Sequence, residues 1–221
     1  MKKILTVLFV SFLFLSFFPN SSNAQFRLRL GPQAGLNFNI GAGSDVKNTT
    51  NGFSAVIGGQ VDMSFNPVIG IMANMQFYDN RYVSESEDGT TNNGTNYTYT
   101  LGTSMAYFNI EPLLKLSIPA SSFFFFIGPS VGFPVQSSYE EKVTSPNDNV
   151  TFDDGSTKHS GTVRNTNTRF EMKLGSGVDI NLGGVYLTPQ VSFGYGLTTI
   201  QEDVEARILT FQLLTTVKFG L

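Results

Sequence analysis

The stretch Phe26–Ile40, FRLRLGPQAGLNFNI, alternates between two kinds of residue over its whole length. Its even positions are apolar: Phe26, Leu28, Leu30, Pro32, Ala34, Leu36, Phe38 and Ile40. Its odd positions are polar or glycine: Arg27, Arg29, Gly31, Gln33, Gly35, Asn37 and Asn39. A helix would bring apolar residues back every three to four positions, whereas a repeat of two belongs to a β-strand. We therefore predict a strand whose two faces differ in chemistry.

The same alternation recurs in seven further segments, each with one apolar parity: 53–65, 69–77, 107–118, 123–135, 169–182, 185–197 and 209–221. The segments between them carry no helical repeat. Eight strands without an intervening helix are typical of an antiparallel up-and-down sheet, and closing that sheet into a barrel removes its exposed edges. We therefore predict an all-β fold, an eight-stranded antiparallel up-and-down β-barrel.

The connections between these segments alternate between short and long. The short ones are turns at Asn66-Pro67, Pro119–Ser122 and Gly183-Gly184. The long ones are polar loops at about 41–52, 79–96, 136–164 and 198–206, with turn dipeptides such as Asp88-Gly89 and Asp154-Gly155. Short periplasmic turns and long extracellular loops are the usual construction of outer-membrane barrels, so we expect both chain ends in the periplasm.

The N-terminus reads as a targeting segment. Lys2 and Lys3 precede the apolar run 4–18, and Ser22-Asn23-Ala24 supplies the small residues of a cleavage site. A spanning helix needs about 20 apolar residues, which makes a membrane anchor the weaker interpretation. We predict that residues 1–24 are a cleaved secretory signal peptide and that 25–221 form the outer-membrane β-barrel domain.

Composition narrows the function classes. Removal of Lys2 and Lys3 leaves 12 basic against 17 acidic residues, a formal net charge of −5, which argues against a nucleic-acid partner. The absence of cysteine excludes a disulfide framework and a thiolate metal site. Charged residues make up 14% of the chain, against about 25% in soluble domains. This deficit suits a chain whose exterior is not all in water.

The chemistry of the two faces indicates which one is outside. A soluble eight-stranded barrel of the lipocalin type would turn a Lys- and Glu-rich face to water, but here the polar face is mostly Gly, Ser, Thr, Asn and Gln. The interior of an eight-stranded barrel is just wide enough for such side chains. We therefore predict a transmembrane barrel of the bacterial outer membrane, with its apolar face in contact with outer-membrane lipid and with periplasmic chaperones and barrel assembly machinery as partners during insertion.

This orientation places ten charged residues inside the barrel: Arg27, Arg29, Lys115, Arg169, Lys173, Lys218, Asp62, Glu111, Glu171 and Asp179. Buried charges are tolerated when they are paired and hydrogen-bonded. We expect a structural plug of salt bridges, and a gated or proton-conducting polar core is the alternative.

Prolines and aromatic residues bear on the ends of the barrel. Pro112, Pro129 and Pro189 fall within predicted strands, where each removes a ladder hydrogen bond, so we expect bulges or a local gap near the periplasmic rim. We expect aromatic girdles from Tyr78, Tyr82, Tyr97 and Tyr99 at the outer interface and from Phe65, Phe123 and Phe219 at the inner one. Phe219 also suits the C-terminal aromatic signature by which assembly machinery recognises barrels.

Residues 107–115, YFNIEPLLK, resemble the strand Y-x-x-I-P-L-L-L-K of PorT-like outer-membrane β-barrel domains, which are common in Bacteroidota. Glu111, an acidic residue before the proline, departs from that pattern. Residues 126–132, FIGPSVG, resemble the family's G-P-x-x-G strand, and 30–38, LGPQAGLNF, its opening G-x-x-x-G-L-N-F. The resemblance implies an eight-stranded barrel in the envelope, and it links some relatives to protein secretion by the type IX route.

Candidate catalytic and metal-binding residues are few. His159 is the only histidine, beside Ser160 and near Asp153 and Asp154, a composition that suggests a Ser-His-Asp arrangement. Its neighbourhood of Asp, Gly, Ser and Thr is typical of a loop tip, so we predict no catalytic residue. Acidic residues of the long loops lack the Asp-x-Asp-x-Asp-Gly spacing of a calcium loop: Glu85, Glu87, Asp88, Glu140, Glu141, Asp148, Asp153 and Asp154. We predict no metal site and no cofactor.

Three functions remain open. The leading hypothesis is a non-enzymatic barrel with a filled interior whose loops serve adhesion, partner binding or envelope integrity, with 79–96 and 136–164 as the partner surfaces. The alternatives are a small solute or ion pathway and an accessory barrel in protein secretion. An envelope enzyme that uses His159 is the weakest hypothesis.

Overall fold

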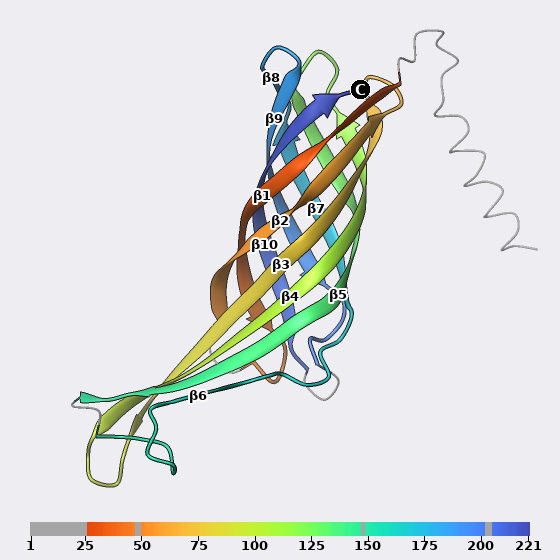
Figure 1. Cartoon of the computed structure of the whole chain (residues 1–221). Coiled ribbons are helices and arrows are strands. Elements are labelled where there is room, and N and C mark those ends of the chain that lie inside the picture. Colours follow the sequence, from red (N-terminus) through yellow and green to blue (C-terminus); the bar gives the residue numbers. More distant parts are fainter. Residues whose placement is uncertain (1–25, 47–49, 147–148, 202–204) are drawn as a thin grey trace, which may run out of the picture.

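The computed structural model describes residues 26–46, 50–146, 149–201 and 205–221, and the predicted signal peptide lies outside the described residues. Ten strands of the described residues form one antiparallel sheet that closes on itself (Figure 1). They are β1 (Arg27–Ala42), β2 (Asn51–Ser64), β3 (Ile69–Thr90), β4 (Asn96–Ser117), β5 (Phe123–Thr144), β6 (Lys158–Gly161), β7 (Arg169–Val178), β8 (Ile180–Asn181), β9 (Val185–Gly196) and β10 (Arg207–Gly220).

Eight of these strands make up the wall of the barrel. The order is β1-β2-β3-β4-β5-β7-β9-β10, and β10 pairs with β1 to close the ring. The short β8 continues β7 beyond Asp179 and pairs with β9, while β6 pairs with β5 outside the ring. The predicted eight-stranded antiparallel barrel is confirmed. No helix in the described part of the chain is long and apolar enough to cross a membrane.

Side-chain alternation places the apolar face outward. In β2, Phe53 and Ile57 are 71% and 55% exposed, whereas Ser54 and Val56 between them are buried. The same pattern runs through β5, β7 and β10, where large apolar side chains are exposed and the residues next to them are buried. An exterior this rich in Phe, Leu and Ile fits hydrocarbon, because a soluble barrel would turn it inward.

The three short turns lie at one end of the barrel, together with the C-terminus (Figure 1). We call this the turn end and the opposite end the loop end. At 66–68, the Asn66 side-chain oxygen accepts hydrogen bonds from the backbone N–H groups of Val68 and Ile69 at 2.8 and 2.7 Å. At the last turn, Gly183 and Gly184 adopt φ values of 81° and 107°, which residues with a Cβ rarely adopt. All three predicted turns are confirmed.

Two of the four predicted loops are wrong in kind. The segment 79–96 is a hairpin in which β3 runs to Thr90 and β4 starts at Asn96, leaving only 91–95 as the turn. In 136–164, β5 continues to Thr144 and 158–161 form β6. Residues 85–90 are polar on both faces and 137–144 nearly so, which hides the alternation that revealed the other strands, whereas 97–101 retains a short alternation, Tyr-Thr-Tyr-Thr-Leu. The other two predicted loops lie between β1 and β2 and between β9 and β10, although 41–42 and 51–52 belong to strands, and 47–49 and 202–204 lie outside the described residues.

A bulge in β3 changes which residues face inward. Phe77 and Tyr78 together oppose a single residue of β4, and both are exposed, at 61% and 45%. The parity of β3 therefore shifts, so that Asp79 and Arg81 point into the barrel and are fully buried. These two charges were missed because they lay in a predicted loop.

The prolines interrupt the ladders of the wall at the turn end. Strands β4 and β5 keep one register from Tyr107↔Pro134 to Ser117↔Phe124, but the pairs between Ile110↔Val131 and Leu114↔Ile127, where Pro112 faces Pro129, are not formed. Pro189 lies beside the break between β7 and β8. The expected local gap is confirmed at both places.

Candidate functional site

The interior of the barrel is filled by buried polar and charged side chains. Arg81, Lys115, Lys173 and Lys218 are each 2% exposed or less, although these side chains are long and charged. Every strand of the wall contributes at least one inward polar residue, because alternate residues of each strand face the interior. The charges form three clusters along the barrel axis.

The turn-end cluster joins three cations to two carboxylates. Asp62 Oδ2 accepts hydrogen bonds from Lys115 Nζ and Lys218 Nζ, both at 2.7 Å. Asp179 contacts Lys115 at 2.9 Å, Lys218 at 2.8 Å and Arg29 at 3.2 Å. Each lysine thus bridges both carboxylates, so no charge of this cluster is buried without an opposite one.

The middle cluster is one ion pair held by amides and a hydroxyl. Lys173 Nζ donates to Glu111 Oε1 and, at 3.1 Å, to Gln212 Oε1. Glu111 Oε2 accepts from Asn74 Nδ2 at 2.9 Å, and Ser130 Oγ lies 3.3 Å from Glu111 Oε1. Residues of five strands meet here, so the cluster connects opposite walls of the barrel.

The loop-end cluster balances two arginines against two carboxylates. Arg81 donates twice to Asp79 Oδ2, from Nε at 2.9 Å and from Nη2 at 2.6 Å. Arg169 pairs with Glu171, and Arg81 Nη2 lies 3.9 Å from Glu171 Oε2. Asn37 Nδ2 donates to Asp79 Oδ1 at 2.7 Å. Because Asp79 and Arg81 complete this cluster, the sequence-based prediction covered only half of its charges.

Apolar side chains close the spaces between the clusters. Met72, Leu113, Phe124 and Phe126 form a buried group toward the turn end, and Lys115 Nζ lies 4.1 Å from the centre of the Phe124 ring. Met105, Tyr107 and Ile208 form a second group toward the loop end. The outward parity predicted for 123–135 places Phe124 and Phe126 inside, and the structure agrees, although these two side chains are apolar rather than polar.

A protruding sheet extends from the loop end (Figure 1). The last β2–β3 pair is Asn51↔Ser84 and the last β5–β7 pair is Gly132↔Arg169, yet β3, β4 and β5 continue together to Thr90↔Asn96 and Thr98↔Thr144. Strand β6 adds to β5 along this extension. The protruding sheet consists of 85–90, 96–101, 137–144 and 158–161.

The family model of the outer membrane protein beta-barrel domain matches residues 24–202, which is most of the chain. The chain belongs to this outer membrane protein β-barrel domain family. Its location is the bacterial outer membrane, and the exposed apolar wall is the surface that faces lipid. The predicted fold class and location are both confirmed.

Solved structures of outer-membrane barrels are similar to this family member at low identity. Ail of Yersinia pestis shares 10% identity at a TM-score of 0.38, covering 87% of this chain and 99% of that one. Neisserial surface protein A shares 12% at 0.37, covering 87% and 96%. The N-terminal barrel of Pseudomonas aeruginosa OprF shares 10% at 0.31, covering 86% and 97%. No curated protein matches the sequence significantly.

Nine of the ten charges predicted to lie inside this outer-membrane barrel belong to the three clusters. The exception is Arg27, whose side chain is exposed at the rim of the turn end. Arg27 is exposed because it is the first residue of β1, so its side chain lies at the rim, where the surrounding wall ends.

His159 lies in β6 of the protruding sheet, and its partners Phe152 and Asp154 lie in the segment just before that strand. His159 Nε2 is 2.8 Å from Asp154 Oδ2, and the ring stacks on Phe152 at 4.3 Å. Ser156 Oγ donates to Asp154 Oδ1 at 2.8 Å, and Ser160 follows His159 in β6 and so faces the opposite side. Within the described residues no serine hydroxyl bonds to His159, as a Ser-His-Asp relay would require. The hydrogen bond from His159 lowers the pKa of Asp154 well below 3.8.

The acidic residues of the protruding sheet do not converge on one point. No group of three or more His, Asp or Glu side chains among the described residues could hold a metal ion, and Asp148 lies outside those residues. Partial burial and a hydrogen bond to Glu141 raise the pKa of Tyr99 above 10.0. Tyr97 and Tyr99 belong to the protruding sheet rather than to the predicted outer girdle, because β4 continues beyond the wall.

Proposed function

We propose that this protein is a closed, non-enzymatic outer-membrane barrel that holds a β-sheet outside the cell for adhesion or partner binding. The observation that carries this proposal is the extension of β3, β4 and β5 beyond the ends of β2 and β7, with β6 added along it. Long extensions of outer-membrane barrels lie on the extracellular side, opposite the short turns.

The filled interior supports a barrel that does not conduct. Three clusters of paired charges and two apolar groups occupy the axis of an eight-stranded barrel, whose interior is just wide enough for side chains. Opening a path would separate buried ion pairs, which is strongly unfavourable.

The protruding sheet offers two different faces and a free edge. One face continues the barrel interior and carries Tyr97, Tyr99, Glu141 and His159. The other face continues the exterior and is rich in hydroxyl groups, as in the Ser86–Thr100 contact of 3.1 Å. Beyond Ser84, the outer edge of β3 has no neighbouring strand within the described residues, and its Glu85, Glu87 and Asp88 oppose edge-to-edge association with another copy.

Shortening the sheet tests the proposal. In one variant an Asn-Gly turn replaces 85–101, and a short Gly-Ser linker replaces 139–161. This variant should insert normally and show the heat-modifiable gel shift of a folded barrel, while cells that carry it lose autoaggregation and attachment to a surface. Unchanged adhesion would refute the partner-binding role. Failure to insert would show that the sheet is structural.

Conductance separates the closed barrel from the solute or ion pathway. We expect no channel current from the purified protein in planar bilayers at any voltage, because the interior is filled. Regular unitary steps would favour the pathway instead, provided that they disappear in a preparation denatured by boiling.

We further propose that the chain belongs to the PorT-like branch of the family. The support is the sequence resemblance at 107–115. Glu111, which departs from that pattern, is the carboxylate of the middle cluster. If the accessory role in secretion holds, a deletion strain should lose secreted proteins from its medium. An unchanged secretome would remove that role.

The signal peptide and the assembly partners are proposals as well. N-terminal sequencing of the protein from outer membranes should begin at Gln25, and Met1 as the first residue would contradict cleavage. Phe219 precedes the last two residues of the chain and is exposed on the outer face. Phe219→Ala should slow insertion by the assembly machinery more than Phe211→Ala, which removes an outward Phe from the middle of the same strand.

A further inference from the structure

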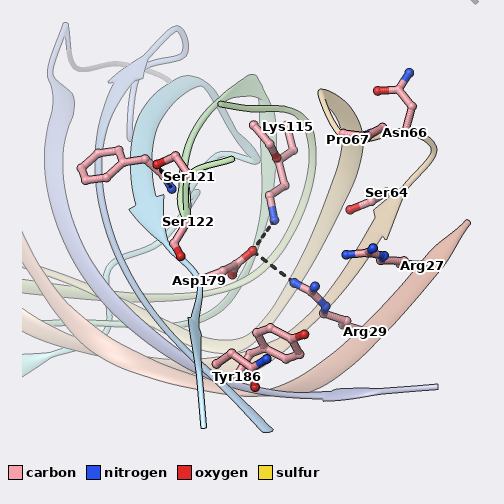
Figure 2. A pocket seen from close by; sticks show the side chains of 13 residues that line it. Arg27, Arg29, Ser64, Asn66, Pro67, Lys115, Ser121, Ser122, Asp179 and Tyr186 are labelled. Atoms are coloured by element: carbon pink, nitrogen blue, oxygen red, sulfur yellow. Dashed lines mark hydrogen bonds and ion pairs between the residues drawn. The ribbon is translucent and has the colours of Figure 1, made fainter. Parts of the chain in front are cut away.

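The turn end of the barrel opens into a cavity of about 340 Å³ (Figure 2). That space would hold about eleven water molecules at about 30 Å³ each, so it has room for a small organic molecule. Its charged lining consists of three cations, Arg27, Arg29 and Lys115, and one carboxylate, Asp179. Serine hydroxyl groups from the turns and strand ends complete much of the polar lining.

Positive charge exceeds negative charge at this cavity. Asp179 is shared by Arg29, Lys115 and Lys218, at 3.2, 2.9 and 2.8 Å, and Asp62 contacts the two lysines again. In the part of the chain that the structure describes, no hydrogen bond or ion pair engages the side chain of Arg27. Four cations thus face two carboxylates. The middle and loop-end clusters, by contrast, are balanced in charge.

The arginines are arranged to receive an oxyanion. The guanidinium carbon of Arg29 lies 3.7 Å from the centre of the Tyr186 ring, which restrains the orientation of this side chain. Figure 2 shows Lys115 and Arg29 directed at Asp179 and the side chain of Arg27 on the same side of Asp179, with no interaction drawn to it. A planar guanidinium donates two parallel N–H groups to a carboxylate or phosphate, and a second arginine beside it favours a ligand with two negative charges.

We propose that this cavity binds a small dianion from the periplasm, a phosphate monoester or a dicarboxylate, between Arg27 and Arg29. The excess of two positive charges matches the charge of such a ligand. The serine hydroxyl groups would donate to its remaining oxygens. The ion pairs with Asp62 and Asp179 already engage Lys115 and Lys218, so the ligand binds at the two arginines at the mouth of the barrel.

Calorimetric titration of the folded barrel in nanodiscs with inorganic phosphate and with succinate tests this site and distinguishes the two chemistries. Arg27→Gln should weaken binding about fivefold to tenfold, which is the effect of removing one charge at a partly solvated site. Because Arg27 has no partner within the described protein, this variant should keep its heat-modifiable gel shift. Asp179→Asn should instead tighten binding.

Arg164→Gln is the matched control, since Arg164 is an exposed arginine at the opposite end of the barrel. It should leave the affinity unchanged. The proposal is overturned if neither anion binds at millimolar concentration, or if Arg27→Gln and Arg164→Gln weaken binding equally. Should Asp179→Asn fail to fold, Arg27→Gln still decides the question.

Discussion

The middle cluster makes a quantitative prediction about whether the barrel interior is dry. Glu111→Gln keeps the size of the side chain but leaves Lys173 buried, at 1% exposure, without an opposite charge. Removing one partner of a buried ion pair costs about 3–5 kcal/mol, because the remaining charge is stranded away from water. With a urea m-value of about 2 kcal/mol/M, the unfolding midpoint should fall by about 1.5–2.5 M.

The matched control is a Glu–Lys ion pair that is exposed to solvent on the surface of the same protein. Glu140 and Lys158 lie 2.8 Å apart on the protruding sheet, with side chains 51% and 55% exposed. Glu140→Gln should cost at most about 1 kcal/mol, because solvent screens an exposed pair. The double variant Glu111→Gln/Lys173→Met should recover about 2 kcal/mol relative to Glu111→Gln, because it removes the stranded charge.

These free energies can be measured by reversible urea unfolding of the barrel in lipid vesicles. The unfolding is followed by tyrosine fluorescence, since the chain has no tryptophan, and by the heat-modifiable gel shift. Equal losses for Glu111→Gln and Glu140→Gln would refute the reasoning. They would mean that water reaches the middle cluster and screens it, and the closed interior would then have to be abandoned in favour of a hydrated pathway.

Three further predictions concern close packing and titration. A Cβ on Gly31 would lie 1.7 Å from the backbone oxygen of Val217, so Gly31→Ala should destabilise the folded barrel by about 1–3 kcal/mol in the same urea titration. Gly220→Ala is the control and should be neutral, because no atom lies within 4 Å of where its Cβ would be. Because the pKa of Asp154 is lowered in the folded state, its carboxylate should stay ionised and in contact with His159 as the pH falls through 3.8, the ordinary value for an Asp carboxyl. NMR of the His159 ring would show this, and loss of the contact already at pH 4 would contradict it. Since burial and Glu141 raise the pKa of Tyr99, absorbance titration should show this phenol ionising above pH 10, and Glu141→Gln should bring its pKa part of the way back, an effect that Glu140→Gln should not share.

Local patterns were enough to predict the wall of the barrel, because each strand there separates lipid from a polar interior. The same reasoning failed for residues 85–90 and 137–144, where polar residues occupy both faces and strand residues look like loop residues. Hydrogen bonding to a neighbouring strand, rather than burial, holds these segments extended. The sequence of one strand does not indicate which strand it pairs with.

The interior charges were predicted as a set but not as pairs. Partners such as Lys173 and Glu111 are 62 residues apart and meet through the closure and tilt of the whole barrel. Asp79 and Arg81 were lost for a different reason. The bulge at Phe77 and Tyr78 exchanges the inward-facing and outward-facing positions of β3 beyond it. Two adjacent aromatic residues in the sequence do not indicate such a bulge.

The continuity of β3, β4 and β5 from the wall into the protruding sheet has a mechanical consequence. A partner that pulls on the tip of the sheet loads these strands along their length, while their inter-strand hydrogen bonds run across them. The load is therefore carried in shear by many bonds at once, instead of opening them one after another as in peeling. Tension applied to the sheet would be delivered to the wall of the barrel that is embedded in the bilayer, without a hinge between the two.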